Sequence, residues 1–285
     1  MTIDPTFDLD DFVRRTLAED LGLGGDVTSA ATIPAGAEFL ASINCREAIV
    51  VAGVDVAAAF FRHLDPGVNI DILVGDGDRI AAGTILMRLE GNARAMLSAE
   101  RSALNTLQHL SGIATLTRRY VEAISGTSTI LLDTRKTLPG LRALDKYAAR
   151  MGGAQNHRLR LDDGILIKDN HVAVCGGVAE AVRAAKAANV GLQVQVEVDR
   201  IDQIEPALDA GADRLLLDNM DIPTLRQALA LNAGRVPLEA SGGVNLDTIR
   251  GIAETGVDYI SVGRITQSAP AVDIGLDYEL RQGSD

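Results

Sequence analysis

The sequence is poor in several residue types that define common protein classes. It has no tryptophan, and aromatic residues make up 3% of its 285 residues. Its two cysteines, Cys45 and Cys175, lie far apart without a CxxC pair, so neither a disulfide framework nor a structural zinc site is indicated. The four histidines form no HxH or HExxH pair. The best candidate for a membrane span, residues 49–61, is interrupted by Asp55 and is shorter than the ~18 residues that a span needs.

Positive charge is also scarce. The chain has 27 Lys and Arg against 39 Asp and Glu, a formal net charge of −12, and it has no lysine before Lys136. This excess argues against nucleic acid and anionic membranes as partners, because both require a broad positive field. The acidic first residues, MTIDPTFDLDD, lack the basic and apolar regions of a signal peptide, so a cytoplasmic location is expected.

The charge is unevenly distributed along the chain. Residues 133–171 hold eight Lys and Arg against five Asp, a net of +3, so the rest of the chain carries −15. The global acidity therefore does not exclude a small anionic substrate that binds near this segment.

From about Ser128 the chain alternates short apolar runs with helical stretches. Continuous apolar runs without a period of two are typical of strands buried on both faces, and strand–helix alternation predicts parallel βα units. No GxGxxG follows the first run, so a barrel is favoured over a dinucleotide-binding sheet. The predicted strands lie within residues 128–136, 163–171, 192–199, 213–220, 236–244 and 257–264.

The first hundred residues predict a different, smaller α/β domain. Residues 8–22 form an amphipathic helix pattern, and strand-like segments follow at 39–53, 68–80 and 83–91. A long helical tract then covers 93–123, in which Gly112 marks the point where a break would fall. In the tail, alternate residues from Val272 to Leu280 predict a strand that returns to the first domain's sheet. The expected domains are 1–112 with the tail 271–285, and the barrel at 113–270.

Catalytic groups of βα barrels project from the carboxyl ends of the strands. The polar residues that close the predicted strands are therefore the candidates for the site, and the QNHR string adds two more. They are Thr134, Arg135, Lys136, His157, Arg158, Lys168, Asp169, Asn170, His171, Glu197, Asp199, Asp218, Asn219, Glu239, Ser241, Gly263 and Arg264.

Two glycine-containing strings indicate a phosphate site. SGGVN (241–245) places backbone N–H groups ahead of a predicted helix, whose dipole favours an anion, and SVGR (261–264) follows the next strand. Phosphate sites are commonly found after the last two strands of a barrel. The alternative is that these glycines only permit tight turns.

The cations at the first strand ends indicate an anionic substrate. Arg135, Lys136, Arg158 and Lys168, together with His157, would create a positive pocket, although surface salt bridges are the alternative. Glu197 and Asp218 close two further strands. Paired carboxylates beside a polyphosphate usually hold Mg²⁺, often through water, or hydrogen-bond sugar hydroxyls. They could also stabilise a cationic transition state, or simply pair with the neighbouring cations.

Several strings, in order, identify a resemblance that covers nearly the whole chain. AEDLGLGGDVTS (18–29), SAERSALNTLQHLSGIATLT (98–117), LDTRKTLPGLRALDKYA (132–148) and NHRLRLDDGILIKDNH (156–171), followed by EASGGVN and ISVGRITQS, resemble the quinolinate phosphoribosyltransferase family. The resemblance implies an N-terminal α/β sandwich domain, an incomplete barrel of about seven strands, and a homodimer that shares its active sites. It also implies a decarboxylating glycosyltransferase that converts quinolinate and phosphoribosyl pyrophosphate into nicotinate mononucleotide, pyrophosphate and CO₂ with Mg²⁺, in de novo NAD biosynthesis.

The resemblance also assigns roles to the residues of this sequence. Lys136, Lys168, Glu197 and Asp218 would be catalytic, and the two acids would hold Mg²⁺ through water. Arg101 would reach the quinolinate of the neighbouring subunit. Where the family usually carries a histidine after the last strand, this chain has Gln267. The substrate-binding set would be Arg101, Thr134, Arg135, Lys136, His157, Arg158, Lys168, Glu197, Asp218, Ser241, Gly242, Gly243 and Gly263.

Three other functions fit part of the sequence. The hairpin pattern of residues 74–92 resembles a biotinyl or lipoyl carrier, but it lacks the lysine that would carry the cofactor. A barrel aldolase would use Lys168 as a Schiff base and would leave the arginines without a role. A related phosphoribosyltransferase that takes nicotinate would need fewer cations.

Overall fold

The computed structural model describes residues 3–279, and internal contacts divide the chain into two compact units. Unit 1 comprises Met1–Leu116, Ala143–Gly152 and Ala269–Asp285, and unit 2 comprises Thr117–Arg142 and Gly153–Ser268. A short helix from the middle of the chain is thus grouped with the N-terminal residues. The domain boundaries expected from the sequence stay a prediction.

Unit 1 contains an antiparallel four-stranded sheet in the order β12-β1-β5-β3. The tail forms β12, which pairs antiparallel with β1 so that Ala41 lies opposite Tyr278 and Cys45 opposite Ile274. The predicted return of the tail to this sheet is confirmed, while Leu280 lies outside the described residues. The strands of unit 1 are β1 (Glu38–Cys45), β2 (Ile49–Val50), β3 (Asn69–Ile72), β4 (Arg79–Ile80), β5 (Ile85–Asn92) and β12 (Ile274–Tyr278).

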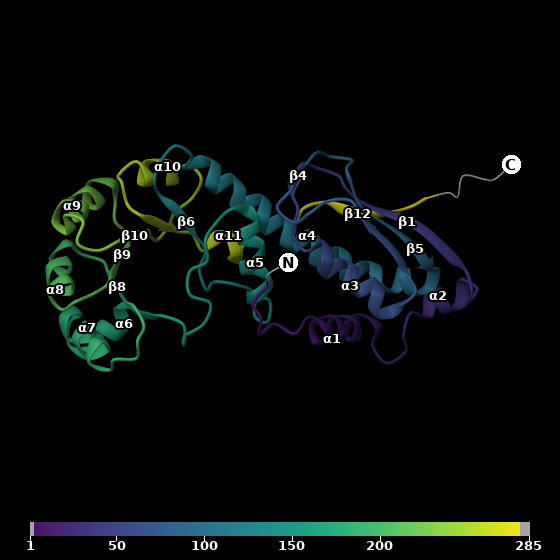
Figure 1. Cartoon of the computed structure of the whole chain (residues 1–285), viewed down its shortest axis with the longest axis horizontal. Helices are drawn as coiled ribbons and strands as arrows, with labels where there is room; N and C mark the ends of the chain where they lie inside the picture. Colours follow the sequence, from purple (N-terminus) through teal and green to yellow (C-terminus); the bar gives the residue numbers. More distant parts are fainter. Residues whose placement is uncertain (1–2, 280–285) are drawn as a thin grey trace. The chain divides into compact units, whose positions relative to one another are not determined.

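Helices lie along one side of this sheet (Figure 1), and their apolar residues, such as Phe60 and Leu107, are buried. The first helix begins after Asp8, whose carboxylate caps it by accepting from the backbone N–H of Asp11, and it ends at Gly22. Phe12 of this helix contacts Phe60 edge to face, with 5.9 Å between the ring centroids. The helices of unit 1 are α1 (Leu9–Leu21), α2 (Val27–Thr32), α3 (Val54–Leu64), the first part of α4 (Ala93–Ala123) and α5 (Arg142–Gly152).

The long helix α4 is continuous, so no break falls at Gly112. The glycine has a packing role instead, because a Cβ at this position would lie 2.2 Å from the backbone oxygen of Pro270. The chain leading to β12 therefore approaches the helix axis closely. Sequence alone could not separate this close approach from a helix break, since both favour glycine.

Unit 2 is an incomplete parallel barrel. Its strands follow the order β6-β11-β10-β9-β8-β7, so β11, the last strand of this unit, pairs with β6, its first. The resemblance implied about seven strands; six are formed, and a single bridge between Leu132 and Gln155 lies where a seventh would be. The strands are β6 (Ile130–Leu132), β7 (Ile165–Ile167), β8 (Val194–Val198), β9 (Arg214–Asp218), β10 (Leu238–Ser241) and β11 (Tyr259–Ser261).

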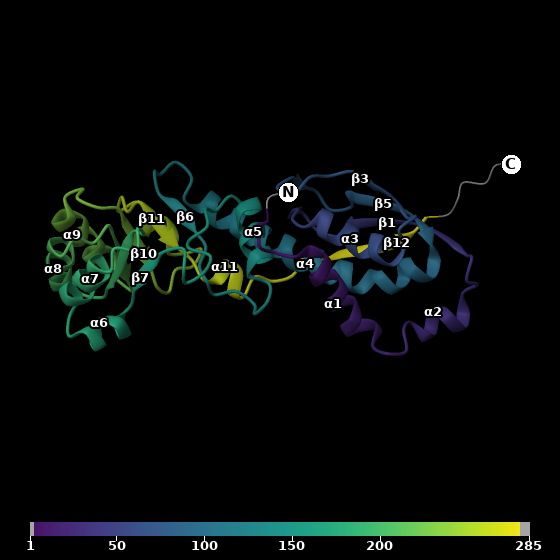
Figure 2. The ribbon, with the colours of Figure 1, turned by 60° about the horizontal axis from the view of Figure 1, so that its bottom comes forward.

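The helices between these strands cover the outside of the barrel, as Figures 1 and 2 show for α7, α8 and α9. The strand interiors are accordingly buried; Leu215 and Leu217 of β9 are both 0% exposed. Among the described residues, no helix is both long and apolar enough to cross a membrane. The helices are α6 (Asp169–Cys175), α7 (Val178–Ala187), the 3₁₀ turn η1 (Ile201–Gln203), α8 (Ile204–Asp209), α9 (Ile222–Asn232), α10 (Ile249–Ala253) and α11 (Arg264–Gln267).

Candidate active site

A cavity of about 750 Å³ opens at the carboxyl ends of the barrel strands. Of the substrate-binding set that the resemblance implies, it brings together every member except Arg101, which is an exposed residue of α4. Among the other strand-end candidates, Asn170, His171 and Asp199 do not line the cavity, whereas Asp169, Asn219, Glu239 and Arg264 do. The members of the substrate-binding set that line it are Thr134, Arg135, Lys136, His157, Arg158, Lys168, Glu197, Asp218, Ser241, Gly242, Gly243 and Gly263.

Several basic residues that line this cavity, among them Arg135, Lys136 and Arg158, form no ion pair within the described residues. No ion pair joins Arg135, Lys136 or Arg158 to a carboxylate there, and the buried Nε of Arg135 has no hydrogen-bond acceptor. The pKa of Arg158 is lowered by burial and by the positive charge of Arg135. Two guanidinium groups that repel each other in a partly buried pocket create a site for an anion, since an anion relieves both the burial and the repulsion.

Lys136 is held at the cavity by its backbone. The hydroxyl of Thr266 donates to the Lys136 carbonyl oxygen at 2.7 Å, and the Lys136 N–H donates to the Thr134 hydroxyl at 3.0 Å. A Cβ at Gly263 would lie 2.7 Å from Cδ of Lys136. Glycine is therefore needed at this strand end for the lysine stem to pass.

Lys168 forms an ion pair with Glu197. Its Nζ lies 3.0 Å from Oε2 of Glu197; the lysine side chain is 51% exposed and the glutamate side chain 12%. The backbone N–H of Lys168 also donates to Nδ1 of His171, which anchors the start of α6.

Asp218 is oriented by the next residue. The Asn219 side-chain amide donates to Oδ2 of Asp218 at 2.6 Å, and its backbone N–H donates to the Ser241 carbonyl at 2.9 Å. Asn219 adopts a left-handed conformation with φ of 54°. A Cβ at Gly242 would lie 2.3 Å from the Asn219 Oδ1 atom. The Asn219 side chain thus occupies the space where a side chain at position 242 would lie, and we call this close packing at the ends of β9 and β10 the interlock.

The predicted phosphate loop differs in one respect from the expectation. Gly242 and Gly243 have positive φ angles of 92° and 59°, which expose the loop backbone to the cavity. However, α10 begins only at Ile249, after a turn capped by Asn245, and it has five residues. The regular helix thus begins a short distance after the loop, while Asn245 acts as the predicted cap: its side-chain oxygen accepts from the backbone N–H groups of Asp247 and Thr248, and its carbonyl oxygen accepts from the Ile249 N–H at 3.0 Å. Backbone N–H groups and the Ser241 hydroxyl remain as donors for an anion.

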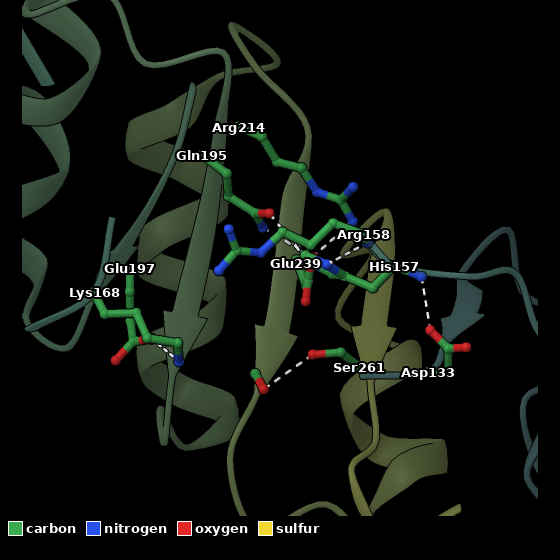
Figure 3. A network of polar contacts seen from close by, with 10 residues as sticks. Asp133, His157, Arg158, Lys168, Gln195, Glu197, Arg214, Glu239 and Ser261 are labelled. Atoms are coloured by element: carbon green, nitrogen blue, oxygen red, sulfur yellow. Dashed lines mark hydrogen bonds and ion pairs between the residues drawn. The ribbon is translucent and has the colours of Figure 1, made fainter. Parts of the chain in front are cut away.

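His157 lies in a network at the floor of the cavity (Figure 3). Asp133, which is fully buried, accepts from the backbone N–H of His157 at 2.8 Å and from the Asn156 amide at 2.6 Å. On the ring, Nε2 lies 3.1 Å from the Gln195 amide oxygen, and Nδ1 accepts from the Arg158 backbone N–H at 2.8 Å. These contacts use both ring nitrogens.

The loop that carries Arg158 is closed by Asp163. The Asp163 carboxylate accepts from the backbone N–H groups of Leu159 at 2.6 Å and Arg160 at 3.0 Å. Burial raises the pKa of Asp163, but these hydrogen bonds outweigh it, so the pKa is lowered. Arg158 itself donates from Nη1 to the Gly164 carbonyl at 2.8 Å. The loop therefore presents the guanidinium group from a fixed backbone.

The acidic residues fit only a metal that is bound largely by its substrate. Within the described part of the chain, no group of three or more His, Cys, Asp or Glu residues could enclose an ion. Glu197 and Asp218 line the cavity, and one oxygen of each is already engaged, by Lys168 and Asn219. Mg²⁺ is commonly bound by one or two carboxylates, waters and phosphate oxygens, so these two acids match that arrangement.

Sequence reasoning missed two kinds of site residue. Leu166, Leu216, Val244 and Val262 line the cavity but carry no polar group that marks them in the sequence. Gln195 and Arg214 lie inside strands, where an apolar run hides single polar residues. For both, the available signal is a polar side chain within a strand predicted to be buried on both faces.

Comparisons with known proteins identify one family. Residues 26–111 match the N-terminal domain and residues 113–277 the C-terminal domain of quinolinate phosphoribosyl transferase. A nicotinate-nucleotide pyrophosphorylase [carboxylating] of Mycobacterium leprae is 46% identical over 94% of this chain and 96% of that protein. A chloroplastic relative of the same name from Arabidopsis thaliana is 40% identical over 95% of this chain and 83% of its own length. The crystal structure of nicotinate-nucleotide pyrophosphorylase from Ehrlichia chaffeensis superposes with a TM-score of 0.92 at 40% identity, covering 96% of this chain and all of that one.

Proposed function

Because the chain belongs to the quinolinate phosphoribosyl transferase family, we propose that it transfers the phosphoribosyl group of phosphoribosyl pyrophosphate to quinolinate with loss of CO₂. The products are nicotinate mononucleotide and pyrophosphate, and the reaction is a step of NAD biosynthesis. The observation that carries this proposal is that Arg135, Lys136 and Arg158 line the cavity and form no ion pair among the described residues. Quinolinate is a dianion and pyrophosphate is more highly charged, so both match this excess.

Quinolinate binding falls to the two arginines in this proposal. A guanidinium group offers a planar pair of donors that matches a carboxylate. Arg135 and Arg158 are close enough for their charges to interact, as the lowered pKa of Arg158 indicates. Each would bind one of the two adjacent carboxylates of the substrate, leaving the ring nitrogen free to attack the anomeric carbon of the ribose.

The loops after β10 and β11 would bind phosphoribosyl pyrophosphate in this proposal. Ser241, Gly242, Gly243 and Gly263 would donate to the 5′-phosphate, and Gln267 lies in the same lining. Asp218, oriented by Asn219, would accept hydrogen bonds from the ribose hydroxyls. Both acids also place negative charge near an anomeric carbon that becomes cationic in the transition state.

The departing pyrophosphate is best stabilised by positive groups that are already oriented before the reaction, because they need no reorganisation in the transition state. Lys136 and Lys168 would bind the leaving group, and the Glu197 carboxylate keeps Lys168 oriented before it arrives. Mg²⁺ held through water by Glu197 and Asp218, when bound, would neutralise part of the pyrophosphate charge. Attachment of the ribose turns the ring into a pyridinium, which accepts the electron pair that the departing 2-carboxylate leaves, and the ring carbon then takes up a proton.

A homodimer completes the proposal. Leu138 and Leu161 lie in the segments that carry the cavity cations, and Val174 lies in α6, directly after β7. They are 43%, 70% and 90% exposed, which supports a surface that is covered in the assembled protein. A second subunit would supply that cover and bring its Arg101 to the bound quinolinate. A cytoplasmic location also stays a proposal, supported by two free cysteines.

The decisive test is an assay of the purified protein with quinolinate, phosphoribosyl pyrophosphate and Mg²⁺. We expect equal amounts of CO₂, pyrophosphate and nicotinate mononucleotide, and about a hundredfold or greater loss of kcat/KM in the Arg158→Ala variant, since a buried carboxylate would lose its partner. Lys186→Ala is the matched control, because Lys186 pairs with Asp213 outside the cavity. Turnover of nicotinate but not of quinolinate would overturn the proposal in favour of the related reaction.

A further inference from the structure

A buried polar layer lies inside the barrel beneath the cavity. It consists of Gln195 on β8, Arg214 on β9 and Glu239 on β10, three adjacent strands. Glu239 is 0% exposed. Its Oε2 accepts from the Gln195 side-chain amide at 2.9 Å and lies 2.8 Å from Nη2 of Arg214. The reaction proposed above gives no role to any of these three residues.

Arg214 is held on two sides. One is the Glu239 carboxylate, and the other is the ring of Tyr259 on β11, whose centroid lies 3.8 Å from the guanidinium carbon. A buried ion pair contributes little net stability, because the desolvation of both charges offsets their attraction. We therefore explain the layer by its contact with His157, which it can position, and not by a contribution to the stability of the barrel.

His157 connects this layer to the site (Figure 3). Its Nε2 lies 3.1 Å from the Gln195 amide oxygen and 3.5 Å from Oε2 of Glu239. Its Nδ1 accepts from the Arg158 backbone N–H, and a backbone N–H only donates. The proton of the neutral ring is then on Nε2, where it points to the Gln195 oxygen.

The charge of Glu239 suits this arrangement. The guanidinium group of Arg214, whose Nη2 lies 2.8 Å from Oε2, supplies the positive charge that compensates the buried Glu239 carboxylate. A carboxylate beside Nε2 favours the tautomer that carries its proton on that nitrogen. Oε1 of Glu239 has no hydrogen-bond partner among the described residues, so the group is not saturated by protein contacts.

We propose that Glu239 is a positioning residue that, with Gln195 and Arg214, holds His157 as the neutral Nε2–H tautomer and so fixes the backbone from which Arg158 reaches the substrate carboxylate. The chain of contacts runs from Glu239 and Gln195 to the imidazole, and from the imidazole to the Arg158 N–H. His157 acts in it as a spacer with both nitrogens engaged. This inference rests on the proposed function only for the identity of the carboxylate.

The first test is the imidazole ¹⁵N spectrum of the unmodified protein at neutral pH, with the His157 signal assigned by its loss in His157→Gln. We expect the shifts of a neutral ring with the proton on Nε2. In Glu239→Gln, which keeps the shape and removes the charge, we expect a mixture of tautomers. A wild-type ring that is cationic, or that carries its proton on Nδ1, would overturn the inference without any need for an active or folded variant.

The second test is kinetic. In Glu239→Gln and Gln195→Leu we expect the KM for quinolinate to rise ~10-fold, as for loss of one charge-assisted hydrogen bond, with kcat and the KM for phosphoribosyl pyrophosphate within about twofold. Glu205→Gln, which breaks the surface pair with Arg235, is the matched control and should change neither KM nor spectrum. A fall in kcat at constant KM would assign Glu239 to the chemistry itself and contradict positioning.

The two proposals fail separately. If the wild-type protein does not turn over quinolinate, the proposed function is wrong, while the ¹⁵N spectrum still reports on the network. If it does turn over quinolinate and Glu239→Gln leaves both the KM and the tautomer unchanged, only the positioning role is wrong.

Discussion

At the scale of single residues, the geometry of the site requires glycine, which has no side chain, at two positions. Gly242 and Gly263 each lie so near another residue of the cavity that a Cβ would fall within 2.3 Å of Asn219 and 2.7 Å of Lys136. These two neighbours are the ones that orient Asp218 and bind the leaving group in the proposed reaction. A methyl group at either glycine would therefore displace a functional side chain, and at Gly242, where φ is 92°, it would also strain the backbone.

Gly242→Ala tests this point against a glycine in open space. Gly242 and Gly256 have nearly the same φ, 92° and 95°, but a Cβ at Gly256 meets no atom within 4 Å. Both alanine variants should lower the free energy of unfolding by about 1–3 kcal/mol, because both force alanine into a left-handed conformation. Only Gly242→Ala should also raise the KM for phosphoribosyl pyrophosphate, by about tenfold. Equal KM values in the two variants, measured with equilibrium unfolding as the reference, would contradict the interlock with Asn219.

At the scale of elements, the loops after the strands line the cavity, and short-range hydrogen bonds fix their conformation. The loop from Arg158 to Gly164 is held by Asp163, which accepts from two backbone N–H groups. The pKa of Asp163 is lowered because these hydrogen bonds favour the ionised carboxylate more than burial disfavours it. The ionised form thus stabilises the loop.

This predicts a pH-dependent effect of Asp163→Asn. A carboxylate whose pKa is lower in the folded protein contributes its full stabilisation above the pKa of the unfolded chain, and loses it as the pH falls through the folded-state value. The variant should lower the free energy of unfolding by about 1 kcal/mol at neutral pH, and the difference should shrink below about pH 4. Denaturant unfolding at several pH values measures it. Asp162→Asn is the control, because Asp162 is 73% exposed and contacts only the Arg160 side chain; an equal effect there would refute the argument.

At the scale of the whole molecule, the net negative charge and the positive charge of the cavity affect different classes of ligand. The net charge of −12 disfavours nucleic acid, whereas Arg135, Lys136 and Arg158 concentrate positive charge at the barrel mouth. In the proposed dimer, the exposed Arg101 would add a further cation to the partner's cavity. If each site contains residues of two subunits, two different inactive variants can complement each other in a mixed dimer.

Mixing two inactive variants should restore activity. Arg101→Ala removes the cation given to the partner, and Lys136→Ala removes one from the cavity of the same chain. When the two are refolded together in equal amounts, half of the dimers are mixed and each contains one complete site, so about a quarter of wild-type activity is expected. Each variant alone should stay inactive, and light scattering should give the mass of a dimer. Full activity of Arg101→Ala alone, or no recovery on mixing, would be incompatible with shared sites.

Much of this protein follows from the sequence by itself. The apolar runs predicted the barrel strands, and each observed strand lies inside its predicted segment, because a strand buried on both faces needs a locally apolar sequence. Candidates such as Lys168 and Asp218 were found because parallel strands place their carboxyl ends at one edge of the sheet, whatever the rest of the packing. The alternating tail residues likewise predicted β12, since a period of two marks a strand with one buried face.

The tertiary structure alone decided what depends on distant neighbours. Gly112 is compatible with a helix break until Pro270 is found packed against it, and only the structure shows that a turn capped by Asn245 separates the SGGVN loop from α10. Glu239, Gln195 and Arg214 lie on three separate strands, far apart in sequence, and only the register of the barrel brings them to His157. The local pattern of apolar and polar residues indicates which face of a segment is buried. Whether a charged side chain is buried, and which residue compensates its charge, is determined only by the packing of the assembled core.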